Sequence, residues 1–222
     1  MIKTIHSFVR RNRRMTKIKQ DALALLTNFG LEIKSNETNL ASIFGRQAPI
    51  NLEIGFGTGE SLVQMALNNP AEDYIGIEIY RSGVSSLLMQ IAIHNLTNIK
   101  IYYADAVEVL RFGIPDNSLN KVMIFFPDPW PKRRHHKRRI IQKEFIILVR
   151  SKLKSGGYLH LATDWEDYVQ HILRIMSSIS HFSNVAGDNI FSPRPNYRPI
   201  TKFEKRGEKL GHKIWELIYR TN

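Results

Sequence analysis

The sequence predicts one α/β domain built on a mostly parallel sheet that has helices on both faces. Short apolar runs alternate with helix-like patterns from Ile50 onward. The runs are almost continuously apolar, as expected for strands that are buried on both faces. The chain has 222 residues, of which 43% are hydrophobic, enough for one well-packed core and too few for two.

Five apolar runs are the expected strands of this sheet, at residues 50–54, 74–79, 99–103, 119–126 and 158–162. Helical spacing recurs between the first three, in one set of Leu62, Met65, Ala66 and Asn69 and a second set of Val84, Leu87, Leu88 and Ile91. This β-α-β rhythm implies crossover connections, which place consecutive strands parallel.

The two ends of the chain depart from this rhythm. A helix is expected around residues 167–177, a proline-rich stretch follows at 192–199, and residues 213–219 are expected to form a last strand that closes the sheet antiparallel. Residues 1–49 predict a basic arm and a lead-in helix near 21–28. We therefore divide the chain into this N-terminal segment and a main domain over residues 50–222.

The charge of the chain is strongly positive, with a formal net charge of +12. One block of cations precedes the first acid, Asp21, and comprises Lys3, Arg10, Arg11, Arg13, Arg14, Lys17 and Lys19. A second block, at residues 132–139, reads K-R-R-H-H-K-R-R. A single charge run is more often a solvated face, but two such blocks in a small chain favour a nucleic-acid partner.

Composition also excludes several classes of protein. The chain contains no cysteine, which excludes disulfides, thiolate metal sites and a cysteine nucleophile. No apolar run approaches the roughly 20 residues of a membrane span, and the N-terminus lacks the apolar core of a secretory signal. We expect a cytoplasmic protein without a membrane partner. No metal is expected either, because His135 and His136 lie in a cationic run without acids or cysteines.

A glycine-rich turn after the first strand predicts a nucleotide site. Residues 53–59 read E-I-G-F-G-T-G, and glycines permit a tight turn that a ligand can approach closely. Glu78 ends the second strand about 20 residues later, where an acid can accept hydrogen bonds from ribose hydroxyls. Together these features predict a cofactor that contains adenosine.

The details favour S-adenosylmethionine over a nicotinamide dinucleotide. The dinucleotide fingerprint needs glycine where this chain has Glu60. Four successive strand ends carry Glu53, Glu78, Asp105 and Asp128, which would repel a pyrophosphate but tolerate a sulfonium cation. We expect Glu53 with Gly55, Gly57 and Gly59 near the methionine half, Glu78 at the ribose, Asp105 toward the adenine and Asp128 at the methyl group.

The fourth strand ends in F-F-P-D-P-W-P-K, residues 125–132, and runs directly into the second basic block. Three prolines fix φ and remove backbone donors, so the loop should hold Asp128 and Trp130 rigidly. Trp130 is expected either to stack on a base or to pack within the loop.

These residues resemble the bacterial-type tRNA (guanine-N(7)-)-methyltransferases. The most specific match is P-D-P-W-P-K-R-R-H-H-K-R-R at 127–139. Further matches are S-F-V-R-R at 7–11, E-I-G-F-G-T-G, I-G-I-E-I at 75–79, A-D-A at 104–106, A-T-D at 162–164, R-P-I-T-K-F-E at 198–204 and R-G-E-K-L-G-H at 206–212. The resemblance runs from about Ser7 to Tyr219. Glu216 departs conservatively, since an aspartate is expected there.

The resemblance implies a class I S-adenosylmethionine-dependent methyltransferase with a Rossmann-like, seven-stranded sheet. It implies methylation of the variable-loop guanosine 46 of tRNA at N7, with Asp128 as both catalytic residue and cofactor contact. The implied contacts to the substrate guanosine are Lys132, Asp164, Thr201, Lys202, Phe203 and Glu204. The implied contacts to RNA are Arg134, His135, His136, Lys137, Arg138 and Arg139.

The implied chemistry is coherent, because guanine N7 carries a lone pair and needs no base before it attacks. Asp164 or Glu204 could accept from the guanine N1–H and amino group, and the alternative for both is a salt bridge. Two other functions compete. A nicotinamide-dependent oxidoreductase conflicts with Glu60 and the acidic strand ends, and a non-catalytic RNA-binding protein would lack the loop that contains Asp128. Oligomeric state has no signal in the sequence.

Overall fold

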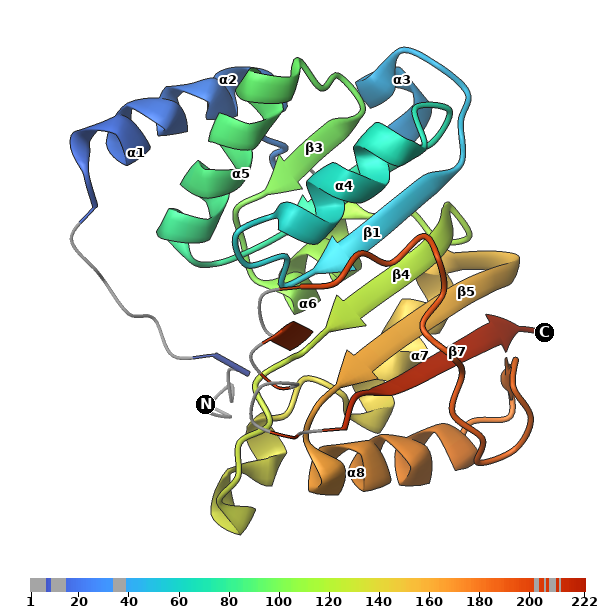
Figure 1. The fold of residues 1–222 in the computed structure, drawn as a ribbon. Helices are drawn as coiled ribbons and strands as arrows, with labels where there is room; N and C mark the ends of the chain where they lie inside the picture. The colour runs from blue at the N-terminus through green and yellow to red at the C-terminus, as the bar shows by residue number, and fades with distance from the viewer. Residues whose placement is uncertain are drawn as a thin grey trace, which may run out of the picture.

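The computed structural model describes residues 7–8, 15–33, 39–201, 204–205, 207, 211 and 213–222. Its seven strands form one sheet in the order β3-β2-β1-β4-β5-β7-β6, and helices cover both faces of this sheet (Figure 1). The strands are β1 (Ile50–Ile54), β2 (Asp73–Ile77), β3 (Ile99–Tyr102), β4 (Leu119–Phe125), β5 (Leu153–Thr163), β6 (Phe182–Asn184) and β7 (Trp215–Thr221).

Strand direction follows the prediction. The first five strands are parallel, and β7 pairs antiparallel with both β5 and β6. The predicted parallel sheet and antiparallel last strand are confirmed. Two details differ from expectation: β5 begins at Leu153 rather than Tyr158, and β6 has only three residues, too few to show a pattern.

The helices fill the connections between these strands. The N-terminal ones are α1 (Lys17–Asp21), η1 (Ala22–Leu25), α2 (Leu26–Phe29) and α3 (Leu40–Phe44). The others are α4 (Glu60–Asn68), α5 (Arg81–His94), α6 (Ala106–Glu108), η2 (Val109–Gly113), η3 (Arg133–Arg138), α7 (Lys143–Lys152) and α8 (Glu166–Ser177). The expected lead-in helix is present as three consecutive short pieces.

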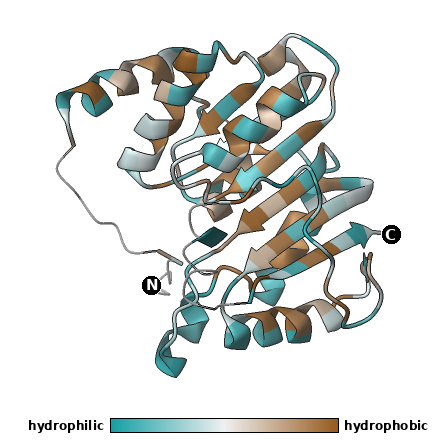
Figure 2. Ribbon diagram, in the orientation of Figure 1, coloured by the Kyte–Doolittle hydropathy of each residue, from teal (hydrophilic) through white to brown (hydrophobic). Residues whose placement is uncertain are grey.

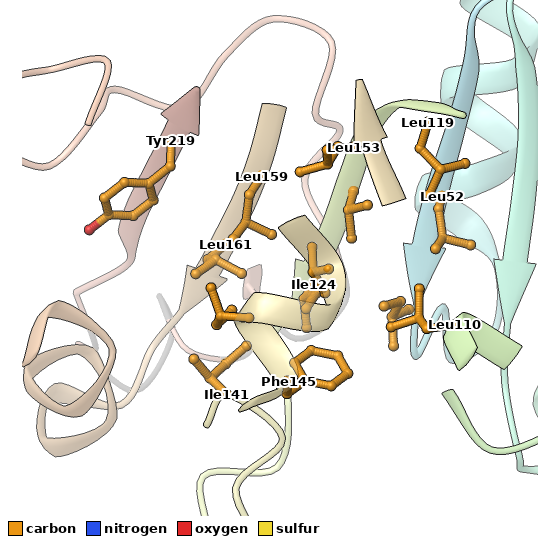
Figure 3. Packing of buried hydrophobic residues seen from close by; sticks show 14 of the residues in the cluster. Leu52, Leu110, Leu119, Ile124, Ile141, Phe145, Leu153, Leu159, Leu161 and Tyr219 are labelled. Carbon is orange, nitrogen blue, oxygen red and sulfur yellow. The ribbon is translucent and has the colours of Figure 1, made fainter. Parts of the chain in front are cut away.

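Two hydrophobic cores lie on the two faces of the sheet, because alternate side chains of each strand point to opposite faces. In β4, Val122 and Ile124 join one core, whereas Met123 and Phe125 join the other. Figure 3 shows part of the first core, to which β4 contributes Ile124, β5 contributes Leu161 and α7 contributes Phe145. The strands are correspondingly apolar throughout most of their length (Figure 2).

The N-terminal helices are attached to the far edge of the sheet. The Ser85 hydroxyl in α5 donates to the Lys19 carbonyl, and the Leu31 amide donates to the Ile101 carbonyl at 2.7 Å. Among the described residues, none of the helices combines the length and apolar composition that a bilayer crossing requires.

The carboxyl ends of β1 to β5 meet at one edge of the sheet, the usual ligand site in such folds. The arrowheads of β1, β4 and β5 in Figure 1 point to this edge. The loop after β4 leads from it into η3, which stands out from the domain and is strongly hydrophilic (Figure 2).

Candidate active site at the carboxyl ends of the strands

Two adjoining cavities open at this edge, of about 230 and 290 Å³. Glu78, Asp105 and Asp128 line the first, and Glu53 lines the second. The two share four lining residues, which are Gly55, Gly57, Phe125 and Phe126. The structure therefore brings together all four acids that the strand ends predicted.

The glycine turn after β1 adopts the conformation that only glycine takes readily. Gly55, Gly57 and Gly59 have φ of +75°, +57° and +82°. Gly83 lets α5 pack closely against this turn, because a Cβ at position 83 would come within 2.2 Å of the Gly57 carbonyl oxygen. No local sequence pattern indicates the role of Gly83, because this contact joins two connections that are separate in the sequence.

Glu78 holds this turn against the end of β2. Its carboxylate accepts from the backbone amides of Gly57 at 2.9 Å, Ile79 at 2.7 Å and Tyr80 at 3.0 Å. Burial raises the pKa of Glu78, and the three amide hydrogen bonds oppose this shift. The carboxylate is thus fixed in orientation beside the first cavity.

Glu53 is buried and only half satisfied. The Ser61 hydroxyl donates to Glu53 Oε1 at 2.5 Å, while Oε2 is buried without a hydrogen-bond partner among the described residues. Burial raises the pKa of Glu53 to about 7; Ser61 opposes the shift, and the charge of Glu78 adds to it. A buried acceptor without a donor is costly. The amino group of S-adenosylmethionine would satisfy it, so these residues fit that cofactor.

Asp105 and Asp128 differ in how they are held. Asp105 is the N-cap of α6, and its Oδ1 accepts from the amides of Val107 at 2.8 Å and Glu108 at 3.2 Å. Asp128 is exposed, on the loop between two prolines. Phe126 and Trp130 in this loop have φ of +50° and +48°, which costs of order 1–3 kcal/mol each and is typical of functional sites.

The prediction that Arg139 contacts RNA is wrong. The Arg139 side chain is fully buried. Its Nε donates to the Pro129 carbonyl at 2.9 Å, its Nη2 pairs with Asp167, and its guanidinium lies 4.8 Å from the Tyr168 ring centroid. A buried guanidinium with these partners cannot reach a phosphate, so Arg139 anchors the loop that carries Asp128.

The rest of the basic block is accessible on η3. Lys132, Arg134 and Lys137 are exposed, whereas His135, His136 and Arg138 are partly covered. This exposure is compatible with contacts to RNA. Of the N-terminal block, Lys17 and Lys19 are described, and the other five cations lie outside the described residues.

Trp130 packs within its own loop. The Arg138 guanidinium lies 4.9 Å from its ring centroid, and its Nε1 donates to the Ser7 carbonyl at 3.2 Å. Of the two expectations, the structure favours loop packing over an open platform for a base. Ser7 and Phe8, the first two residues of the S-F-V-R-R motif, also line the first cavity, and the other three lie outside the described residues.

The residues expected to contact guanosine are distributed unevenly. Thr201 lines the second cavity, and Asp164 lies half-buried just past β5. Glu204 is buried, and both of its carboxylate oxygens are bonded to Arg198. Its geometry therefore matches the salt-bridge alternative. Lys202 and Phe203 lie outside the described residues.

The chain is similar in sequence to known methyltransferases. A family model described as "Putative methyltransferase" matches residues 47–217. A tRNA (guanine-N(7)-)-methyltransferase of Alcanivorax borkumensis is 51% identical over 99% of this chain and 92% of its own. Those of Idiomarina loihiensis and Pseudomonas aeruginosa are 49% and 51% identical, over 100% and 98% of this chain and 91% and 90% of theirs.

The chain belongs to the tRNA (guanine-N(7)-)-methyltransferase family. Solved structures agree at the level of the fold. The 16S rRNA methyltransferase KamB superposes with a TM-score of 0.61 at 11% identity, covering 85% of this chain and 95% of its own. An antibiotic-related methyltransferase gives 0.55 at 16% identity, over 86% and 96%. The fold of this family member is thus the class I S-adenosylmethionine-dependent methyltransferase fold.

Proposed function

We propose that the protein methylates N7 of guanosine 46 in the variable loop of tRNA, with S-adenosylmethionine as donor, and forms 7-methylguanosine. The observation that carries the proposal is the pair of cavities lined by Glu53, Glu78, Asp105 and Asp128 directly beside the exposed cations of η3. The near-complete similarity to tRNA (guanine-N(7)-)-methyltransferases supports the choice of substrate.

The acids have separate roles in holding the donor. Glu53 would pair with the amino group, Glu78 would accept from the ribose hydroxyls, and Asp105 would face the adenine. The glycine turn at 55–59 lets the backbone approach closely, and a Cβ on Gly55 would meet no protein atom within 4 Å. The bound donor supplies an electrophilic methyl group on a sulfonium.

Asp128 is the proposed catalytic residue. The attacking N7 has a lone pair, so no residue needs to remove a proton first. Positive charge develops on the guanine ring as the bond forms, and a carboxylate fixed nearby stabilises that charge more in the transition state than in the ground state. The rigid loop between Pro127 and Pro129 keeps Asp128 at the rim of the first cavity.

The methionine half of the donor would extend to Glu53 in the second cavity, and the guanine is proposed to approach this cavity from the side of Thr201. Thr201 lines this cavity, and Lys132 and Asp164 would complete the contacts together with Lys202 and Phe203. A tertiary-paired base must leave its stack to get there, which costs a few kcal/mol. Phosphate contacts offset this cost, and the candidates are Arg134, His135, His136, Lys137 and Arg138 of η3.

The test is methyl transfer from radiolabelled S-adenosylmethionine to unmodified tRNA transcripts, followed by borohydride and aniline cleavage at 7-methylguanosine. Wild type should give cleavage at the variable loop, and Asp128→Asn should lower kcat about 100-fold or more. Glu166→Gln, which removes an exposed acid of α8, is the matched control. Cofactor binding without any labelling of tRNA would leave a methyltransferase with a different substrate.

A further inference from the structure

A buried group of charged residues lies next to the second cavity without lining it. Arg198 donates from Nη1 to Glu204 Oε2 at 2.6 Å and from Nη2 to Glu204 Oε1 at 3.0 Å. The same Nη2 pairs with Glu216 of β7, and the Arg198 side chain is fully buried. One guanidinium thus joins a residue of β7 to the segment that follows Thr201.

The group continues into the sheet. His160 of β5 lies 2.6 Å from Glu216 Oε2 through its Nε2, and the Tyr197 hydroxyl lies 2.9 Å from its Nδ1. Burial lowers the pKa of His160, an effect that Glu216 opposes, and this favours the neutral ring. A carboxylate can only accept, so Nε2–H donates to Glu216 and Nδ1 accepts from Tyr197. We call these five residues, Tyr197, Arg198, His160, Glu204 and Glu216, the Arg198 network.

The Arg198 network touches residues that do line the cavities. The Arg198 guanidinium lies 5.6 Å from the ring centroid of Phe125 and 5.8 Å from that of Phe126, both of which line both cavities. The His160 ring meets Phe125 edge to face at 4.9 Å. The Glu204 amide donates to the Thr201 hydroxyl at 3.1 Å. Network contacts therefore reach the two phenylalanines that line both cavities and Thr201, which lines the second cavity.

The network also crosses the sheet on the same face as Glu53. Strand register pairs Glu53 with Met123 and Met123 with His160, so these side chains share one face. Residues 192–201 run across β5 and β4 toward β1 in Figure 1, and Lys121 of β4 lies 3.6 Å from the Tyr197 ring centroid. The segment before Thr201 is thus fastened over the strands that end at the site.

Stability alone is a weak reason to bury these charges. Desolvating an arginine and two carboxylates opposes folding, and apolar residues of similar volume in their place often give a protein that is equally stable. What the ions add is fixed geometry, because the arginine fork bonds both oxygens of Glu204 in one plane. We propose that Arg198, Glu216 and His160 are positioning residues, which hold Phe125, Phe126 and Thr201 in the arrangement that methyl transfer requires. This inference rests on the proposed function.

Glu216→Gln and Glu216→Asp test this positioning role, because the first removes the charge that holds Arg198 and the second keeps it. The matched control is Lys152→Met, which breaks the 2.6 Å ion pair between the buried Lys152 and the exposed Asp116, a residue that precedes the amino end of β4. Steady-state methylation of tRNA, equilibrium binding of cofactor and tRNA, and melting temperature are measured for each variant. All kinetics are run well below the lowest melting temperature.

We expect Glu216→Gln to lower kcat about tenfold, with both binding constants within about twofold of wild type. Glu216→Asp should recover most of kcat, and Lys152→Met should lose stability without losing kcat. Combining Glu216→Gln with Thr201→Ala should give less than the sum of the single effects if the network acts through Thr201.

The proposal is overturned if Glu216→Gln keeps wild-type kcat while its melting temperature falls as in Lys152→Met. If Glu216→Gln does not fold, Arg198→Lys decides on the same criteria, because it keeps the buried charge and loses the fork. An inactive wild type would instead refute the proposed function, so the two failures are distinguishable.

Discussion

The two halves of the site are built in different ways. On the β1–β2–β3 side, the acids are held by nearby backbone: Glu78 by three amides and Asp105 by the start of α6. On the β4–β5–β7 side, positions depend on side chains far apart in sequence, as in Arg198 with Glu216 and Arg139 with Asp167. The acids of the β1–β2–β3 side are thus held by backbone amides, whereas the β4–β5–β7 side is held by ion pairs between residues that are distant in the sequence.

This difference suits the two ligands. Backbone amides and tight glycine turns are rigid and small, which matches a cofactor that must be held in one pose. The other side must accept a large RNA, and its long-range ion pairs keep an exposed loop in place. Changes on the first side should therefore affect cofactor affinity, and changes on the second should affect turnover, stability or RNA binding.

The largest effect on binding is expected on the cofactor side. Glu78→Ala removes the proposed ribose acceptor and leaves the amides of Gly57, Ile79 and Tyr80 without their partner. We expect cofactor affinity to fall about 100-fold, or about 2.7 kcal/mol, with tRNA affinity unchanged. Isothermal titration with S-adenosylhomocysteine measures it, and Glu108→Gln, an exposed acid on α6, is the control. If Glu78→Ala also lost affinity for tRNA, the division of the site into a cofactor side and an RNA side would be wrong.

A smaller effect should separate two arginines of the same basic block. Arg139→Met loses bonds to Pro129 and Asp167, so we expect the free energy of unfolding to fall by about 2 kcal/mol. Arg134→Met removes an exposed cation and should leave stability unchanged while lowering the salt dependence of tRNA binding by about one phosphate contact. Urea unfolding and salt titrations measure these, and equal stability losses would refute the assignment of Arg139 as an anchor.

Sequence patterns predicted the four acids at the strand ends and missed the long-range contacts of the β4–β5–β7 side. Strand ends and the glycine turn are visible as short patterns, so Glu53, Glu78, Asp105 and Asp128 could be assigned to one edge. In the sequence Arg139 is indistinguishable from the other cations of the second basic block, because only its tertiary contacts show that it is buried. His160 and Glu216 are 56 residues apart and meet only through the pairing of β5 with β7.

The fold shows the same limit. Buried parallel strands gave clear apolar runs, whereas the start of β5 contains Lys154, Ser155 and Gly156, which look like a turn. That stretch is an irregular part of the strand, because Leu153 pairs with Leu119, the register then shifts, and regular pairing with β4 resumes only at Tyr158.

The smallest effect concerns pH on the cofactor side. Glu53 has a pKa raised to about 7 by burial and must be ionised to pair with an ammonium group, so cofactor binding should release a proton. Affinity should therefore increase about fivefold from pH 6 to pH 7. Glu53→Gln should bind weakly and show no such dependence. Binding isotherms of wild type and Glu53→Gln between pH 6 and pH 7 test this prediction. If Glu53→Gln keeps the pH dependence of wild type, the proton that is released on cofactor binding comes from another group.

The most direct test of the central claim replaces guanosine 46 of a tRNA transcript by 7-deazaguanosine, which keeps the Watson–Crick edge but has no N7 lone pair. Our account predicts that this tRNA binds with unchanged affinity and accepts no methyl group, while the unmodified transcript is labelled at position 46. Undiminished labelling of the 7-deaza tRNA would show that the methyl group goes to another atom.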